Sequence, residues 1–207
     1  KKHKKTFIHP FDDEDVIIGQ GTMALEILNQ SFFPIDYLLV PIGGGGLISG
    51  MINVFKQKSP KTRIIGIEPK GAPSMYESMR QNKRITLDRI DNFVDGAAVK
   101  TIGKISFDYC SKFLDDIVIV DEGEICQNIL TMYNNDAIIV EPAGAMSITG
   151  LNKMSKSIKD KNVVCLICGG NNDITRMSEI KERALLFNNL KHYFVIRFPQ
   201  RAGALKE

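Results

Sequence analysis

Four short runs of apolar, mostly β-branched residues alternate with segments of helical periodicity, and this alternation constrains the fold more than any other feature of the chain. Each run is apolar at nearly every position, which is typical of a strand buried on both faces of a sheet. The runs are residues 37–42, 63–67, 117–120 and 163–168. Strands that alternate with helices form parallel sheets with helices on both faces. We therefore expect an α/β fold.

The helical segments between these runs show their own local signals. Apolar residues recur at helical spacing at Ile48, Ile52 and Phe55, and again at Ile125, Ile129 and Met132. Asp121 followed by Glu124 predicts a capping box for the second of these helices. Gly21 and Thr22 precede another helical pattern, so we expect Thr22 to be the N-cap of a helix that starts there.

Charge and cysteine usage narrow the functional classes. The 207 residues include 27 basic and 24 acidic side chains spread along the chain, for a net charge of +3, which argues against nucleic acid as a partner. The one basic cluster, residues 1–5, is interpreted as a solvated tail. Cys110, Cys126, Cys165 and Cys168 are too few and too dispersed for a disulfide scaffold. We expect reduced thiols and a cytoplasmic protein, because no leader or long apolar segment is found.

The last twenty residues differ in pattern from the rest. A helix that ends near Phe187 gives way to a turn at Asn188 and Asn189 and then to a single apolar run at 193–198. Pro199 and Gly203 follow, and the final residues resemble the first turn of a helix. We therefore predict one domain over residues 1–187 and the beginning of a second over 188–207. The alternative is that the 193–198 run forms a C-terminal strand of the first domain.

Four consecutive glycines stand between the first apolar run and the helix that follows it: Gly43, Gly44, Gly45 and Gly46, with Leu47 next. Without side chains, their N–H groups can converge on an anion at the helix N-terminus. A flexible linker is the competing interpretation, but linkers do not normally join a buried strand directly to an amphipathic helix. The segment predicts a phosphate-binding turn.

The spacing of the glycines tests two common phosphate motifs. A Walker A loop requires Gly-Lys-Ser or Gly-Lys-Thr, whereas Gly50 is followed by Met51. The dinucleotide fingerprint requires glycine at the sixth position, where this chain has Ile48 or Ser49. Both nucleotide motifs are excluded, Ser49 being a near miss.

A second polar turn, Gly169 to Asn172, follows the run at 163–168. Ligands bind at the carboxyl ends of parallel strands, so this turn is expected on the same sheet edge as the glycine loop. The CxxC spacing of Cys165 and Cys168 also suggests zinc, but residues three apart on a strand point to opposite faces and cannot chelate one ion. We expect Cys165 in the core and Cys168 facing the ligand.

Six motifs together resemble the catalytic domain of pyridoxal-phosphate-dependent threonine dehydratases. That family shares the tryptophan synthase β-like fold, fold type II, with serine dehydratases and serine racemases. The motifs occur in the family's order and span essentially the whole chain: FIHPFDD at 7–13, GQGT at 19–22, GGGGL at 43–47, DGAAV at 95–99, EPAGA at 141–145 and CGGN at 168–171.

The resemblance implies a cofactor, pyridoxal 5'-phosphate, and a set of contacts for it. The amides of the glycine loop would hold its phosphate, Cys168 would face the pyridine nitrogen, and Gly96 and Glu141 would lie near the ring. Glu141 could equally start a helix, since it precedes Pro142. The implied reaction converts L-threonine to 2-oxobutanoate and ammonia, the first step of isoleucine biosynthesis. A neutral thiol at the ring nitrogen would favour elimination over transamination.

The resemblance also shows what this sequence does not contain. The family's lysine that binds the cofactor covalently has no counterpart here, and Lys100 is expected to be a surface residue. We therefore name no catalytic base and expect no turnover by this chain alone. The segment 68–74 resembles a cation site of some relatives, which use a glutamate and, six positions later, an aspartate. Here Glu68 is retained, but Ser74 stands in place of the aspartate, so we expect no metal.

Residues 193–205 resemble the opening strand and helix of an ACT-like regulatory domain, which implies allosteric control by isoleucine or valine. A homo-oligomer is also implied. Two alternatives stay open: a serine dehydratase or racemase of the same fold, and a non-catalytic phosphate-ligand or regulatory module.

Overall fold

A four-stranded parallel sheet forms the centre of the computed structural model, which describes residues 6–197. The strands are β1 (Tyr37–Pro41), β2 (Arg63–Pro69), β3 (Asp116–Val120) and β4 (Val163–Cys165), in the order β3-β2-β1-β4. β1 is central and pairs with β2 and β4, with Tyr37 opposite both Arg63 and Val163. The predicted α/β fold with a parallel sheet is confirmed, and all four predicted runs contribute a strand.

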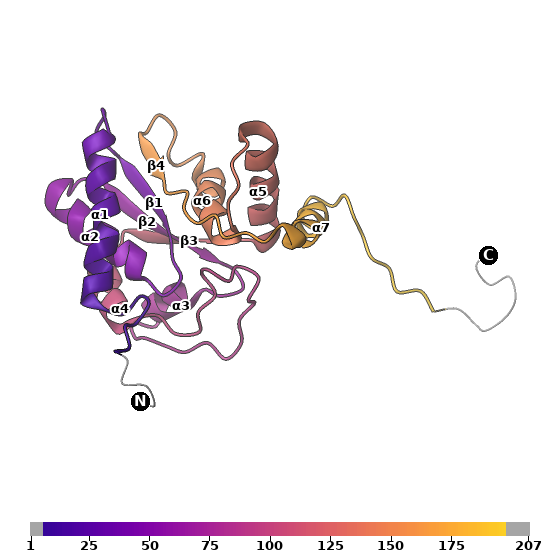
Figure 1. Ribbon diagram of the computed structural model, residues 1–207, viewed down its shortest axis with the longest axis horizontal. Coiled ribbons are helices and arrows are strands. Elements are labelled where there is room, and N and C mark those ends of the chain that lie inside the picture. Colours follow the sequence, from indigo (N-terminus) through magenta and orange to yellow (C-terminus); the bar gives the residue numbers. More distant parts are fainter. Residues whose placement is uncertain (1–5, 198–207) are drawn as a thin grey trace, which may run out of the picture.

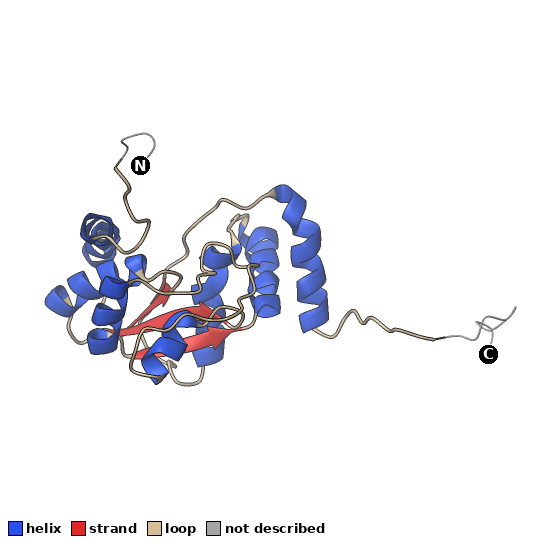
Figure 2. Cartoon of the chain, turned by 90° about the horizontal axis from the view of Figure 1, so that it is seen from below, coloured by secondary structure: helices blue, strands red, loops and turns tan. Residues whose placement is uncertain are grey.

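Helices cover both faces of this sheet, as Figures 1 and 2 show. One face carries α1 (Glu14–Gln30), α2 (Gly46–Lys58) and α4 (Lys104–Phe113), and the other carries α5 (Glu122–Asp136), α6 (Met146–Met154) and, packed on α5, α7 (Met177–Phe187). The short α3 (Ser74–Arg80) follows β2, and two 3-10 turns, η1 (Pro142–Ala145) and η2 (Ile174–Arg176), precede α6 and α7. None of the helices within residues 6–197 has the length and apolar character needed to cross a membrane.

The two faces of β1 bury separate apolar cores. Leu38 and Val40 pack against the α2 and α4 side, while Leu39 packs against the α5 and α6 side, and all three are fully buried. Phe55 of α2 and Ile125 of α5 are also fully buried, one in each core. A strand buried on both faces needs apolar residues at consecutive positions. This is why the sequence shows continuous apolar runs instead of alternation.

The prediction that Thr22 caps a helix is wrong. α1 begins at Glu14, and the carboxylate of Asp13 caps it by accepting hydrogen bonds from Asp15 N at 3.0 Å and Val16 N at 3.2 Å. Thr22 lies inside the helix, where its hydroxyl donates to Gly19 O. Gly21 had been expected just before the start of the helix. It is instead the place where α1 and α2 approach closely, because a Cβ at Gly21 would lie 3.3 Å from Gly50 O.

The predicted capping box of α5 forms only in part. Asp121 is the N-cap and accepts a hydrogen bond from Gly123 N at 2.9 Å. Glu124 does not complete the box, since its carboxylate reaches Lys153 of α6 at 3.9 Å. Contact with a neighbouring helix, which no local pattern encodes, decides where this side chain points.

β4 is shorter than the predicted run at 163–168 because it ends at Cys165. Leu166 N still donates to Leu39 O at 3.1 Å, but Leu166 O accepts from the hydroxyl of Ser147 at 2.6 Å. The chain then leaves the sheet, so that Gly169 O accepts from Glu141 N. Contacts with the η1 and α6 region therefore end the strand before the apolar run ends.

The C-terminal segment departs from prediction beyond α7. The helix ends at Phe187, and the turn at Asn188 and Asn189 is confirmed, with Asn189 at φ 56°. The strand predicted at 193–198 is not formed over the described part, 193–197, where the chain runs away from the sheet and is exposed (Figure 1). A strand needs a hydrogen-bonding neighbour, and this stretch has none among residues 6–197. The remaining predictions for 198–207, and that for residues 1–5, lie outside the described residues.

Candidate functional site

The glycine loop lies between β1 and α2, as predicted. β1 ends at Pro41, α2 begins at Gly46, and Gly45 is the N-cap residue with φ 96° and ψ 0°. This left-handed conformation strongly favours glycine. A Cβ at Gly45 would also lie 2.5 Å from the Cβ of Ser106, so both the backbone and the available space require glycine here.

Two carbonyl groups of the loop, those of Gly44 and Gly45, are held by hydrogen bonds. Gly44 O accepts from Gly103 N at 2.9 Å, and Gly45 O accepts from both the amide and the hydroxyl of Ser49, at 3.0 and 2.7 Å. In a planar trans peptide the C=O and the following N–H point in opposite directions. The N–H groups of Gly45 and Gly46 therefore point away from Gly103 and Ser49, the residues that donate to these carbonyls. No residue in the described part of the chain accepts a hydrogen bond from the loop amides 43–46.

A cavity of about 340 Å³ opens in front of the loop. This volume lies within the range of small-molecule sites. All eight residues predicted to contact a cofactor line it, namely Gly43, Gly44, Gly45, Gly46, Leu47, Gly96, Glu141 and Cys168. Free amides, a left-handed glycine and a cavity of this size fit a phosphate-bearing ligand.

The sequence prediction missed several lining residues. Pro10 and Phe11 precede α1, Val16 and Gln20 lie on it, and Ala143 lies in η1. Phe11 packs directly on the loop, because a Cβ at Gly44 would lie 2.2 Å from its ring. The FIHPFDD motif contains Pro10 and Phe11 and could have indicated them, but nothing in that motif predicts contact with a loop thirty residues away.

Cys168 and Glu141 both line the cavity, and they lie close enough together for the charge of Glu141 to act on the Cys168 thiol. Glu141 occupies the N-cap position of η1, yet its side chain makes no capping hydrogen bond there and accepts instead from Asn171 N at 3.2 Å. It also borders Gly96 and Gly169, where an added Cβ would lie 3.0 and 2.4 Å from Glu141 Oε1. Of the two roles expected for Glu141, the cavity-facing one agrees with this geometry.

Burial raises the pKa of the Cys168 thiol, and the charge of Glu141 raises it further. A neutral thiol therefore faces the cavity at neutral pH. Cys165 packs into the core on the α5 and α6 side, where burial raises its pKa to about 11, while Cys168 packs toward the other core. Cys165 thus packs in a core and Cys168 lines the cavity, and all four cysteines are free.

Glu68 and Lys100 lie outside this cavity. The fully buried carboxyl of Glu68 accepts hydrogen bonds from Met75 N and Tyr76 N at 2.8 and 2.7 Å, and burial raises its pKa to about 8. It thus stabilises the first turn of α3. Residues 6–197 hold no group of three His, Cys, Asp or Glu side chains placed to bind a metal. Lys100 is exposed and donates to Asp88 O.

The fold and the cavity define a class of enzyme: a parallel sheet with helices on both faces and, at the carboxyl end of β1, a glycine loop whose free amides border a cavity. The family model described as pyridoxal-phosphate dependent enzyme matches residues 1–169. The chain belongs to this family, and its fold is the fold-type II arrangement.

Among individual proteins, the chain is 59% identical over 206 residues to the biosynthetic L-threonine dehydratase IlvA of Halalkalibacterium halodurans. It is 53% identical over 203 residues to that of Bacillus subtilis. These alignments cover 100% and 98% of this chain but only 50% and 48% of the relatives. The chain thus spans about half the length of the curated relatives that it matches.

Solved structures show the same relationship. The processed form of threonine deaminase isoform 2 from Solanum lycopersicum superposes with a TM-score of 0.85 at 38% identity, over 89% of this chain and 51% of that one. Serine racemase from Dictyostelium discoideum superposes with a TM-score of 0.75 at 32% identity, over 84% and 55%.

Proposed function

We propose that the full-length protein dehydrates and deaminates L-threonine to 2-oxobutanoate and ammonia, the first step of isoleucine biosynthesis, and that this chain supplies the phosphate-binding half of its cofactor site. The observation that carries the proposal is the unpaired set of loop amides in a chain 59% identical to a biosynthetic L-threonine dehydratase. An enzyme of this family needs such amides for pyridoxal 5'-phosphate.

The glycine loop would hold the phosphate. The N–H groups of Gly45 and Gly46 point away from Gly103 and Ser49, which donate to the loop carbonyls, and the start of α2 adds the positive end of its dipole. Gly43 and Gly44 let Ala97 and Phe11 lie close against the loop, because a Cβ at Gly43 would be 2.9 Å from Ala97 Cα and one at Gly44 2.2 Å from the Phe11 ring. The loop binds and orients, and it transfers no proton.

Cys168 would face the pyridine nitrogen. When bound, the cofactor supplies an electron sink for the electrons of the bond broken at the substrate α-carbon. Because burial and Glu141 both raise the pKa of the thiol, it stays protonated and neutral. A neutral partner does not hold a proton on the ring nitrogen as an aspartate would, which favours elimination over transamination. Gly96 lets Glu141 lie close beside the ring position.

The lysine that binds the cofactor covalently has no counterpart among the residues of this cavity, whose lining contains no lysine. The test compares the full-length protein with the 207-residue chain, each supplied with the cofactor and L-threonine. We expect 2-oxobutanoate and ammonia in equal amounts from the full-length protein and none from the 207-residue chain. Absence of product from full-length protein that has bound cofactor would refute the proposed reaction.

A second candidate is a serine dehydratase or serine racemase, favoured by the likeness to the Dictyostelium discoideum enzyme. Parallel assays with L-serine, in which pyruvate and D-serine are measured, separate these reactions from threonine dehydration. A regulatory role for residues 188–207 as the start of an ACT-like domain is part of the same proposal. We propose that the full-length protein is a cytoplasmic homo-oligomer. Its activity should fall when isoleucine is added and should also change when valine is added, with both amino acids binding to the ACT-like domain.

A further inference from the structure

We propose that Asp12 is a positioning residue for the glycine loop, acting through the start of α4. The proposal rests on the proposed function, because it assigns Asp12 a part in holding the cofactor phosphate. Asp12 does not line the cavity. Its effect passes through two successive layers of hydrogen bonds: the first joins the Asp12 carboxylate to the amides at the start of α4, and the second joins Gly103 N to the loop.

The first layer joins Asp12 to α4. One carboxylate oxygen accepts from Lys104 N and the other from Ile105 N, both at 2.9 Å, although these residues are more than ninety positions away in the sequence. The N-cap residue of α4 is Gly103, which has no side chain to cap the helix itself. A Cβ at Gly103 would lie 2.7 Å from Asp12 Oδ1. Asp12 therefore supplies the cap that the helix lacks.

The second layer joins α4 to the loop. Gly103 immediately precedes Lys104 and Ile105, the two residues whose amides Asp12 holds. Gly103 N donates to Gly44 O at 2.9 Å. This bond fixes the peptide between Gly44 and Gly45, and its planarity turns the N–H of Gly45 to the opposite side. If α4 loses its cap, Gly103 is released and the Gly45 N–H is no longer held in one direction. Anion binding by the loop depends on that direction.

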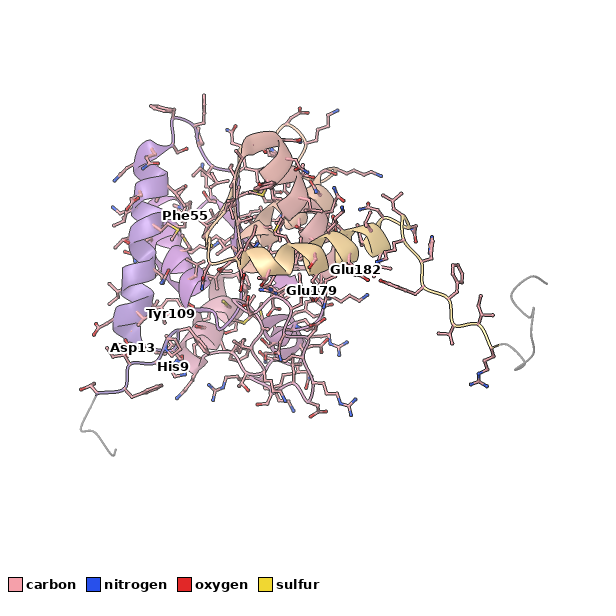
Figure 3. All side chains as sticks on the ribbon, turned by 45° about the vertical axis from the view of Figure 1, so that its right-hand side comes forward. His9, Asp13, Phe55, Tyr109, Glu179 and Glu182 are labelled. Carbon is pink, nitrogen blue, oxygen red and sulfur yellow. The ribbon has the colours of Figure 1, made fainter. Side chains whose placement is uncertain are left out.

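Neighbours of Asp12 hold the same segment against the loop. Phe11 packs its ring on Gly44, and its backbone oxygen would lie 2.9 Å from a Cβ at Gly46. His9 Nδ1 accepts from Asp12 N at 3.0 Å, which fixes the turn that presents the carboxylate. Figure 3 shows His9 and Asp13 together at the start of α1. The segment His9 to Asp12 is thus held by contacts with both the loop and α4.

The test measures how strongly the chain prefers a phosphate-bearing ligand. Isothermal titration of the 207-residue chain with pyridoxamine 5'-phosphate and with pyridoxamine gives two dissociation constants, whose ratio isolates the phosphate contribution. Neither compound carries an aldehyde, so neither reacts with surface lysines. The variants are Asp12→Ala, which removes both acceptors, and Asp12→Asn, which retains one.

Asp13→Ala is the matched control. Asp13 is the adjacent residue, carries the same charge, and caps α1 through two backbone amides just as Asp12 caps α4. We expect the wild-type chain and Asp13→Ala to prefer the phosphate form equally. Asp12→Ala should lower this preference about tenfold, equivalent to about 1.4 kcal/mol, and Asp12→Asn should lower it less. Affinity for pyridoxamine should stay unchanged in every variant.

Each other outcome has a defined meaning. An unchanged preference in Asp12→Ala would refute the role of Asp12, and an equal loss in Asp13→Ala would show a general effect of helix capping. If Asp12→Ala does not fold, Asp12→Asn decides the question, since a preference equal to that of the wild type refutes the proposal. If the wild-type chain itself shows no preference for the phosphate form, the proposed site fails, and the role of Asp12 fails with it.

Discussion

Gly45→Ala should disrupt the phosphate loop through two separable effects. The first is conformational: Gly45 has φ 96° and ψ 0°, and a left-handed backbone costs an L-residue about 1–2 kcal/mol. The second is steric: the new Cβ would lie 2.5 Å from the Cβ of Ser106 and 2.9 Å from its hydroxyl. Ser106 is fully buried, and overpacking of this kind costs about 1–3 kcal/mol. The substitution should therefore lower the free energy of unfolding by about 2–5 kcal/mol.

Urea unfolding followed by far-ultraviolet circular dichroism measures this loss, since the chain has no tryptophan for fluorescence. Gly19→Ala is the control, because a Cβ there meets nothing within 4 Å and an exposed helical glycine gains about 0.5–1 kcal/mol on replacement by alanine. The double variant Gly45→Ala with Ser106→Gly removes the clash but leaves the backbone cost. It should therefore be more stable, by about 1–3 kcal/mol, than the sum of the two single losses predicts.

The reasoning is refuted if Gly45→Ala unfolds at the wild-type urea concentration. It is also refuted in part if the two substitutions are strictly additive, because the steric contribution would then be absent. Titration with pyridoxamine 5'-phosphate provides a second measurement, in which Gly45→Ala should lose the preference over pyridoxamine while Gly19→Ala retains it.

Three further predictions concern other parts of the chain. Burial raises the pKa of Glu68 from 4.5 to about 8, so the folded chain holds this proton more tightly than the unfolded chain does. The stability that this proton contributes is fully present below pH 4.5 and is lost as the pH rises to 8. The urea concentration at the unfolding midpoint should therefore fall between pH 5 and 8 more steeply for the wild type than for Glu68→Gln. Equal slopes for the two proteins would contradict this prediction. Because the charge of Glu141 contributes to the raised pKa of Cys168, Glu141→Gln should speed iodoacetamide labelling of Cys168 at pH 8, as followed by peptide mass spectrometry; an unchanged rate would argue against the contact. Gly50→Ala places a Cβ 2.5 Å from a backbone oxygen of α1 and should cost about 1–3 kcal/mol in urea unfolding, whereas Gly19→Ala on α1 should not destabilise; equal effects would contradict the close approach of the helices.

Much of the fold could be predicted from local patterns. The apolar runs identify each of the four strands, because a strand buried on both faces is apolar at consecutive positions. The helical spacing of Ile48, Ile52 and Phe55 identifies the buried face of α2. The glycine loop and Cys168 were placed at one sheet edge by the rule that parallel strands carry ligands at their carboxyl ends, and both line the cavity.

The errors occur where a distant segment decides a local outcome. Gly21 suggested a helix start, but it is an interior glycine that allows α1 to approach Gly50 of α2. The run at 163–168 suggested six strand residues, but Ser147 takes the carbonyl of Leu166 and β4 ends at Cys165. Neither partner can be inferred from the sequence near the error, because both contacts form only when the helices pack on the sheet.

The amino-acid sequence by itself determined the order of strands and helices along the chain and the position of the glycine loop, since these depend on short-range periodicity and on the conformational freedom of glycine. Only the tertiary structure decided how the loop amides are oriented. Their direction depends on Gly103, Ser49 and, through α4, Asp12. Asp12 and Gly103 lie far from the loop in the sequence, and they meet it only because α1 and α4, which follow them, both pack beside α2 in the folded chain.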